Sequence, residues 1–458
     1  MSLLLTGGTV VTSLDASRVL RADVLVEADR VAAVGPSAAS RANGSRVGRD
    51  GLVTIDCSGC LIVPGNVCAH THVYSALARG MPQRLQPPRD FLDLLRRLWW
   101  RLDRALDPKS IAASAAVGAL EALLAGTTTL VDHHASPTAI DGSLDIIAGQ
   151  FERLGLRSVL AYEVTDRDGH GAAVAGLAEN ERFLRAIQAG DHRLTRGMVG
   201  AHASFTLSDS TLDRCAAAAR RFGTGLHIHA AEDTIDERDA VATHGRRVIA
   251  RLADAGALDD RTLLAHGVHL DEAEAELVVT SGATVAHNPR SNMNNGVGRA
   301  PLHLLGARVA LGTDGIGADM FEESRLGYLR LRDGGDDPAV DWPLDRLAEG
   351  SRLAGRIFNE PQLGVIEPGA PADLVVLDYP APTPLSPESL AGHWLFGLSA
   401  RMVRDVVVAG RVVVADHRLA TADGARIAAT AGEAAERLWR RVDALDEHPY
   451  RPAGLAIR

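Results

Sequence analysis

Hydrophobic and polar positions alternate with a period of two near both ends of the chain. Residues 4–34, 372–379 and 405–419 consist of short β-branched runs interrupted by glycine, alanine and aspartate. This alternation, broken by turn residues, is typical of strands that pair in hairpins. We therefore expect a small composite β-sandwich domain in which residues 1–60 supply one part and residues 361–458 the other.

The pattern changes between these ends, where short apolar runs are each followed by a helical stretch. This succession is typical of parallel βα units. The candidate strands lie at residues 61–69, 128–134, 157–164, 196–202, 225–231, 262–266, 283–287 and 307–313. Eight units over about 300 residues match the size of a (β/α)8 barrel. We predict an α/β fold with a TIM-type barrel over residues 61–360, and an amphipathic helix near residues 424–448 that packs back on the molecule.

Charge and composition narrow the classes of partner. The 458 residues carry a formal charge of −10 and no long run of like charges, so the usual basic surface of a nucleic-acid-binding protein is missing. No apolar stretch reaches the roughly 18 residues that a membrane span needs, and no signal peptide is evident. Four cysteines are too few for a disulfide scaffold. We expect a cytoplasmic protein that binds neither membrane nor nucleic acid.

Histidines and acids gather at the carboxyl ends of the predicted strands, where barrel enzymes place their active sites. The strongest pair is His70 and His72, because residues two apart on a strand point to the same face. His229 on the fifth strand and Asp314 after the eighth would complete a site of three nitrogens and one oxygen with room for water. Such ligands suit Zn(II) or Fe(II).

Other polar residues near these strand ends have two interpretations. His227 shares the face of His229 but lies one layer deeper, so we interpret it as a supporting or core histidine. His133 and His134 are neighbours and face opposite ways in a regular strand, so at most one reaches the site. His287 fits a structural role as well as a functional one. Glu232 reaches the site only if the chain turns after His229, and there it could move protons.

Six motifs together resemble the amidohydrolase superfamily, in the subgroup of cytosine, guanine and adenosylhomocysteine deaminases and triazine hydrolases. They are PGNVCAHTH (64–72), GTTTLVD (126–132), HAAE (229–232), LLAHGVHLD (263–271), AHNPRSN (286–292) and GTDG (312–315). The segments DHHASPTAIDGSLD, HASFTLSD and HNPRSNMNNGVG are most similar to aminohydrolases of the SsnA type. The resemblance covers essentially the whole chain.

The resemblance implies one divalent metal, with zinc preferred over iron, bound by His70, His72, His229 and Asp314. It also implies that Glu232 shuttles protons to a ring nitrogen and that His266 holds the attacking hydroxide. Asp314 then accepts the proton of the activated water. Lys109 is the only lysine and sits at a predicted helix start, which argues against a carboxylated lysine that bridges two metals.

The implied activity is hydrolytic deamination of an amino-substituted nitrogen heterocycle: a purine, oxidised purine, pterin or pyrimidine. Opening of a cyclic amide, hydrolysis of another C–N or C–Cl bond on the same site, and an inactive structural homologue are the alternatives. A dinucleotide site is disfavoured because no G-x-G-x-x-G follows the first strand.

Substrate contacts are expected from the loop after His72 and from polar residues at other strand ends. The candidates are Gln83, His134, Glu163, His202 and Asn292, with Tyr74, Arg79, Arg84 and residues 293–295 nearby. The expected partner is a small molecule, and relatives with this fold suggest a homo-oligomer.

Overall fold

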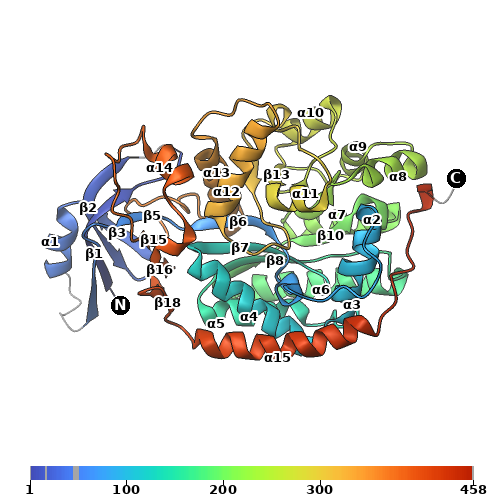
Figure 1. Cartoon of the computed structure of the whole chain (residues 1–458), viewed down its shortest axis with the longest axis horizontal. Coiled ribbons are helices and arrows are strands. Elements are labelled where there is room, and N and C mark those ends of the chain that lie inside the picture. The colour runs from blue at the N-terminus through green and yellow to red at the C-terminus, as the bar shows by residue number, and fades with distance from the viewer. Residues whose placement is uncertain (1, 16–17, 45–50, 456–458) are drawn as a thin grey trace.

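Strands from residues 2–64 and from residues 374–419 join in one nine-stranded sheet at one end of the molecule, and the barrel fills most of the rest (Figure 1). The computed structural model describes residues 2–15, 18–44 and 51–455. The barrel strands are β6 (Asn66–Thr71), β7 (Thr127–His134), β8 (Arg157–Tyr162), β9 (Thr195–Gly197), β10 (Val199–Ala203), β11 (Leu226–Ala230), β12 (Leu263–His266), β13 (Thr284–His287) and β14 (Val309–Leu311).

These strands form two parallel sheets in chain order, β6 to β9 and β10 to β14. Parallel bridges from Val164 to Ala201 and from Thr71 to Asp314 join the sheets at both edges, so the ring closes. The strands are buried on both faces, as expected where helices cover a parallel sheet. The predicted (β/α)8 barrel is confirmed.

Helices surround the barrel, and five of the ten begin at a side-chain cap. They are α4 (Pro108–Leu124), α5 (Ser143–Leu154), α6 (His170–Ala189), α7 (Asp209–Phe222), α8 (Thr234–His244), α9 (Val248–Asp254), α10 (Glu272–Ser281), α11 (Pro289–Asn295), α12 (Met320–Asp333) and α13 (Trp342–Phe358). In α4, for example, Asp107 and Ser110 form a capping box before a run of alanine and leucine. Lys109 is exposed in the first turn of this helix.

The first and fourth predicted barrel strands are each divided in two. Residues 61–69 separate into β5 (Leu61–Pro64) and β6, because Pro64 has no N–H to donate and Gly65 passes close to Thr128. A Cβ at Gly65 would lie 2.2 Å from Thr128 Oγ1, so only glycine fits where the backbone passes this threonine. Residues 196–202 separate into β9 and β10 at Met198.

The nine-stranded sheet is built from both chain ends, as the alternation of hydrophobic residues predicted. Its strands are β1 (Ser2–Val11), β2 (Val19–Glu27), β3 (Arg30–Val34), β4 (Leu52–Asp56), β5, β15 (Leu374–Leu377), β16 (Val403–Val408), β17 (Arg411–Ala415) and β18 (Arg418–Leu419). The two ends meet where β5 pairs with β1 on one side and with β15 on the other. The buried pair of Arg157 and Asp373, with N–O distances of 2.8 and 3.0 Å, ties β8 of the barrel to this sheet.

Short helices and the C-terminal segment complete the fold. They are α1 (Ser37–Gly44), η2 (Val73–Ala78), α2 (Phe91–Leu94), η3 (Leu95–Trp99), α3 (Trp100–Ala105), η4 (Ser204–Thr206), η5 (Leu302–Leu304), α14 (Leu390–Phe396), η6 (Ala400–Met402), α15 (Gly424–Asp443) and η7 (Ala453–Leu455). Helix α15 packs along α3 and α4, as predicted, and Trp439 donates a hydrogen bond to the Leu77 carbonyl at 2.7 Å (Figure 1). Among the described residues, no helix has the length and apolar character of a membrane span.

Candidate metal centre and active-site pocket

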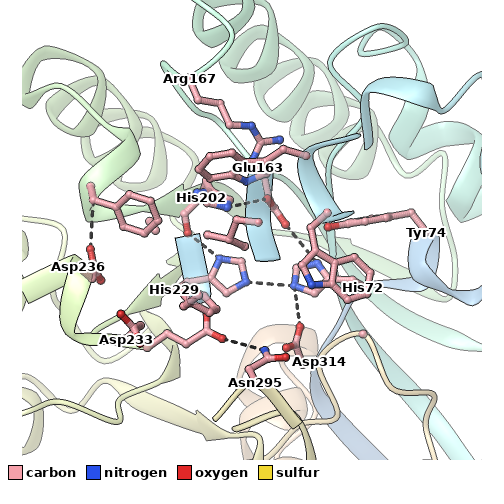
Figure 2. Close-up of a pocket in the computed structure, with 18 residues that line it drawn as sticks. His72, Tyr74, Glu163, Arg167, His202, His229, Asp233, Asp236, Asn295 and Asp314 are labelled. Carbon is pink, nitrogen blue, oxygen red and sulfur yellow. Dashed lines mark hydrogen bonds and ion pairs between the residues drawn. The ribbon is translucent and has the colours of Figure 1, made fainter. Parts of the chain in front are cut away.

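The four predicted metal ligands converge at the carboxyl end of the barrel. His72 Nε2 lies 3.1 Å from His229 Nε2 and 3.1 Å from Asp314 Oδ1 (Figure 2). His70 Nε2 lies 3.7 Å from the same carboxylate oxygen. Ligands at about 2.0–2.1 Å from a tetrahedral ion stand roughly 3.3 Å apart. The observed separations therefore match ligand atoms arranged around one ion in the space between them.

Hydrogen bonds behind the imidazoles direct their Nε2 atoms toward this space. His72 Nδ1 donates to the His133 carbonyl at 2.6 Å, and His229 Nδ1 donates to the His202 carbonyl at 2.7 Å. A neutral histidine that donates from Nδ1 presents a lone pair at Nε2, the form that binds metals. The backbone of the neighbouring strands thus selects the ligating tautomer.

Buried atoms without partners give an independent sign that a cation belongs here. His70 Nε2 and His266 Nε2 are buried and have no hydrogen-bond partner. The ligand atoms of His70, His229, His266 and Asp314 lie within 4.8 Å of one another, and His70, His72, His133 and His229 form a second, overlapping group. An orphaned buried nitrogen is costly unless something satisfies it. The donor set fits a divalent metal.

The ionisation of these groups suits metal binding. Burial lowers the pKa of His70, and it lowers that of His229 to about 4, so both rings are neutral near pH 7. Burial opposes ionisation of Asp314, but interactions with the neighbouring rings of His70 and His72 outweigh it and hold its pKa well below the usual range. For His72, hydrogen bonds to Asp314 and Glu163 outweigh burial and raise the pKa, so a bound metal would displace a proton from this ring.

A sharp turn after β11 brings Glu232 to the pocket. Ala231 has φ of +50°, a left-handed conformation that non-glycine residues rarely adopt, and its N–H donates to Asp236 Oδ2 at 2.8 Å. Glu232 Oε2 then lies 3.5 Å from His266 Nε2. Burial, together with repulsion from Asp314, raises the pKa of Glu232 well above its usual value. The chain therefore makes the turn after His229 that Glu232 needs in order to reach the site.

His266 is held in a strained conformation at the end of β12. Its φ is +76°, and its Nδ1 donates to Asn292 Oδ1 at 2.8 Å. Asp314 shows the same feature with φ of +51°, and its second oxygen accepts a hydrogen bond from Ser291. Backbone strain of this kind persists where surrounding structure enforces it and clusters at functional sites.

Two of the five predicted substrate-binding residues line the pocket beside the metal ligands. His202 and Glu163 lie there, with His202 Nε2 at 3.9 Å from Glu163 Oε2 (Figure 2). Asn292 instead supports His266, and His134 turns away to Ser136 at 2.9 Å. Gln83 is exposed and lines a neighbouring cavity. The structure thus brings together His202 and Glu163 but not the other three.

The structure also decides between the adjacent histidines of β7. The His133 ring stacks on His227 with centroids 4.2 Å apart and lies 5.0 Å from the His229 ring. His133 belongs to the histidine cluster, whereas His134 does not. His287 is buried at the end of β13, outside both groups of ligands.

An aromatic wall completes the pocket, which has a volume of about 660 Å³ including its mouth, and the sequence had indicated only Tyr74 among its residues. The wall residues are Tyr74, Phe91, Trp99, Trp100 and Phe205. Most of them come from η2, α2, η3 and α3, between the first barrel strand and the first barrel helix. The adjacent tryptophans of that segment, which follow His70 and His72 in the chain, were the feature of the sequence that could have indicated this wall. Flat apolar surfaces of this kind suit a planar ring.

Comparisons with known proteins agree with this geometry. Residues 61–413 match the family model described as the amidohydrolase family. The chain is 31% identical over 385 residues to a 5'-deoxyadenosine deaminase of Methanopyrus kandleri, covering 82% of this chain and 86% of the relative. It is 32% identical over 442 residues to a 5-methylthioadenosine/S-adenosylhomocysteine deaminase of Halobacterium salinarum, covering 92% and 94%.

A solved structure shares the fold over nearly the whole chain. An adenosine deaminase from Xanthomonas campestris with bound zinc superimposes with a TM-score of 0.82 and 27% identity, covering 97% of this chain and 99% of that one. The family match spans both the barrel and part of the sheet built from the chain ends. This protein belongs to the amidohydrolase family, and is a hydrolase that acts on carbon–nitrogen bonds.

Proposed function

We propose that this protein is a zinc-dependent aminohydrolase that removes the exocyclic amine from an aminopurine, as a free base or nucleoside. The observation that carries the proposal is the juxtaposition of the metal ligands with Glu232 and His266 at the base of an aromatic pocket. The named activities of the relatives on adenosine derivatives favour a purine over a pterin or pyrimidine.

A divalent ion held by His70, His72, His229 and Asp314 would lower the pKa of a bound water toward neutrality and so supply the nucleophile. The ionised Asp314 would accept the proton that this water loses, while Ser291 holds its other oxygen. His266 Nε2 faces the same space, with Asn292 behind it, and would orient the attacking water.

Glu232 would serve as the proton donor to the ring nitrogen beside the carbon under attack. Its raised pKa favours the protonated form near neutral pH, which a donor requires. Protonation of that nitrogen lets the ring accept electrons as water adds, and a second proton passed to the amine lets ammonia leave. Water adds one oxygen and the amine departs, so the net change is replacement of NH2 by OH.

We further propose a single zinc ion. Three imidazoles and one carboxylate suit zinc, and the solved relative contains it. Lys109, the only lysine, is exposed in the first turn of α4 and does not line the pocket, which supports one metal rather than a pair bridged by a modified lysine. Metal analysis of the purified protein, with zinc and iron measured separately, tests both statements.

We also propose a cytoplasmic homo-oligomer. The four cysteines are free and buried, which fits a reducing compartment. Phe396 on α14 is 75% exposed and is an apolar surface residue that a subunit contact would cover. Light scattering after size exclusion measures the oligomeric state.

The deciding experiment measures ammonia release by the zinc-loaded protein, with product masses, on adenine, guanine, adenosine, 5'-deoxyadenosine, a pterin and cytosine. Deamination predicts ammonia with a mass gain of about 1 Da, and the ring that reacts identifies the substrate. A gain of about 18 Da without ammonia would mean that a cyclic amide opens instead. A zinc-loaded protein inert on the whole panel would contradict the proposal.

A further inference from the structure

The only arginine or lysine among the described pocket-lining residues is already engaged by acidic side chains. Arg167 lies at the far side of the pocket from Asp314, beside Glu163 (Figure 2). Its side chain is 1% exposed, its Nη2 contacts Asp103 Oδ2, and its Nε lies 3.1 Å from Asp168 Oδ2. The Arg167 guanidinium carbon also sits over the Trp100 ring, 5.2 Å from its centroid. Asp103, Asp168 and Trp100 therefore hold this cation in place.

The charge of Arg167 is balanced within the protein. Burial raises the pKa of Asp168, but hydrogen bonds from His448 and Arg167 outweigh it and lower that pKa, so Asp168 is ionised at neutral pH. His448 Nε2 lies 3.1 Å from Asp168 Oδ1 and comes from the C-terminal segment after α15. Glu163 is a further acidic side chain that lines the pocket beside the guanidinium (Figure 2).

The rest of the pocket offers no compensating cation outside the metal site. Five acids line it: Glu163, Glu232, Asp233, Asp236 and Asp314. Asp236 accepts the N–H groups of Ala231 and Phe205, and Asp233 caps α8 at Ile235 N. An anionic substituent on the substrate would find, among the described lining residues, only an arginine that already contacts Asp103 and Asp168, so no free arginine or lysine would compensate its charge.

We infer that the pocket selects amino-heterocycles whose substituents are uncharged, and rejects those that carry a carboxylate or phosphate. The inference rests on the proposed function for its choice of aminopurines. It separates the substrates named for the relatives: 5'-deoxyadenosine and 5-methylthioadenosine are neutral, whereas S-adenosylhomocysteine ends in an amino acid.

The test compares uncharged ligands with ligands that carry a carboxylate or phosphate, all of which share one ring. Binding of 5'-deoxyadenosine, 5'-methylthioadenosine, S-adenosylhomocysteine and adenosine 5'-monophosphate is followed by quenching of the tryptophan fluorescence of the zinc-loaded Glu232→Gln protein, since Trp99 and Trp100 line the pocket. Ammonia release by the unmodified protein gives kcat/KM for the same set. The two uncharged ligands should exceed zwitterionic S-adenosylhomocysteine and the anionic monophosphate by about 100-fold in both measurements.

A charge variant tests the cause of the selection. Asp168→Asn removes the carboxylate that balances Arg167 and should improve S-adenosylhomocysteine relative to 5'-deoxyadenosine by about tenfold. Asp145→Asn removes an equal charge from an exposed pair with Arg182 and should leave that ratio unchanged. Thermal unfolding establishes that both variants are folded.

The outcomes separate the two proposals. Selective binding of the neutral ligands without ammonia from any of them would overturn the proposed function and support the pocket inference. Ammonia release from S-adenosylhomocysteine or the monophosphate within tenfold of 5'-deoxyadenosine would overturn the inference and support the function. Absence of binding by all four ligands would overturn both.

Discussion

His70, a proposed metal ligand, is supported by a second histidine, because its Nδ1 lies 2.9 Å from Nε2 of His227. If His70 binds the ion through Nε2, its Nδ1 carries the proton and His227 must accept it as a neutral ring. Burial keeps the pKa of His227 far below its usual value, which maintains that neutral form. The stacked His133 ring covers the other side of His227.

Replacement of His227 should therefore weaken metal binding. His227→Phe keeps a ring in contact with His133 but cannot accept the His70 proton, and zinc affinity should fall by about 10- to 100-fold. Competition with a zinc chelator measures this change. His227→Gln retains an acceptor and should recover part of the affinity, while His134→Phe, which alters a buried histidine bonded only to Ser136, should leave it unchanged. Equal zinc affinity in all three would show that His227 is a packing residue.

Metal binding and proton transfer should be separable by mutation. His70→Ala removes a ligand and should abolish both bound zinc and turnover. Glu232→Gln keeps the shape of the side chain without its proton, so the zinc content should stay normal while kcat falls by about 100- to 10,000-fold. Elemental analysis alongside steady-state kinetics measures both quantities. Full activity of Glu232→Gln would rule out the shuttle role.

The left-handed turn at Ala231 should be needed for the position of Glu232. A β-branched residue is strained at φ of +50°, so Ala231→Val should lower the free energy of unfolding by about 1 to 3 kcal/mol and reduce kcat. Ala231→Gly adopts the same conformation without strain and should keep activity. Denaturant unfolding and kinetics on the two variants check this contrast, and a fully active valine variant would contradict it.

Asp236, which holds the N–H groups of Ala231 and Phe205, should make stability depend on pH. Burial raises its pKa to about 7, above the roughly 3.9 of an unfolded chain, so the folded state binds the extra proton between these values. Its contribution to the free energy of unfolding is present below about pH 4 and is lost as pH rises through about 7, a change on the order of 4 kcal/mol.

Asp236→Asn removes this titration and retains an acceptor oxygen. The stability of the variant relative to the unmodified protein should therefore increase from pH 4.5 to about 8, as judged by urea unfolding at several pH values. A difference that stays constant with pH would mean that Asp236 remains ionised in the folded protein.

The hydrophobic pattern alone determined the barrel, the joining of both chain ends in one sheet and the late amphipathic helix, because these depend on periodicities of two and of about 3.6 residues. It also placed His70, His72, His229 and Asp314 at strand ends. Strand ends of a parallel barrel share one face, so residues far apart in the chain could be predicted to meet.

Only the tertiary structure decided which other residues lie beside these four. The choice of His133 over His134 depends on which face of β7 turns inward, a matter of barrel register. The approach of Glu232 depends on a left-handed alanine, which carries no sequence signal comparable to glycine or asparagine. Gln83 lies outside the pocket while Trp99 and Phe205 form its wall, because the path of the chain after His72 is set by packing between distant segments and not by any local pattern.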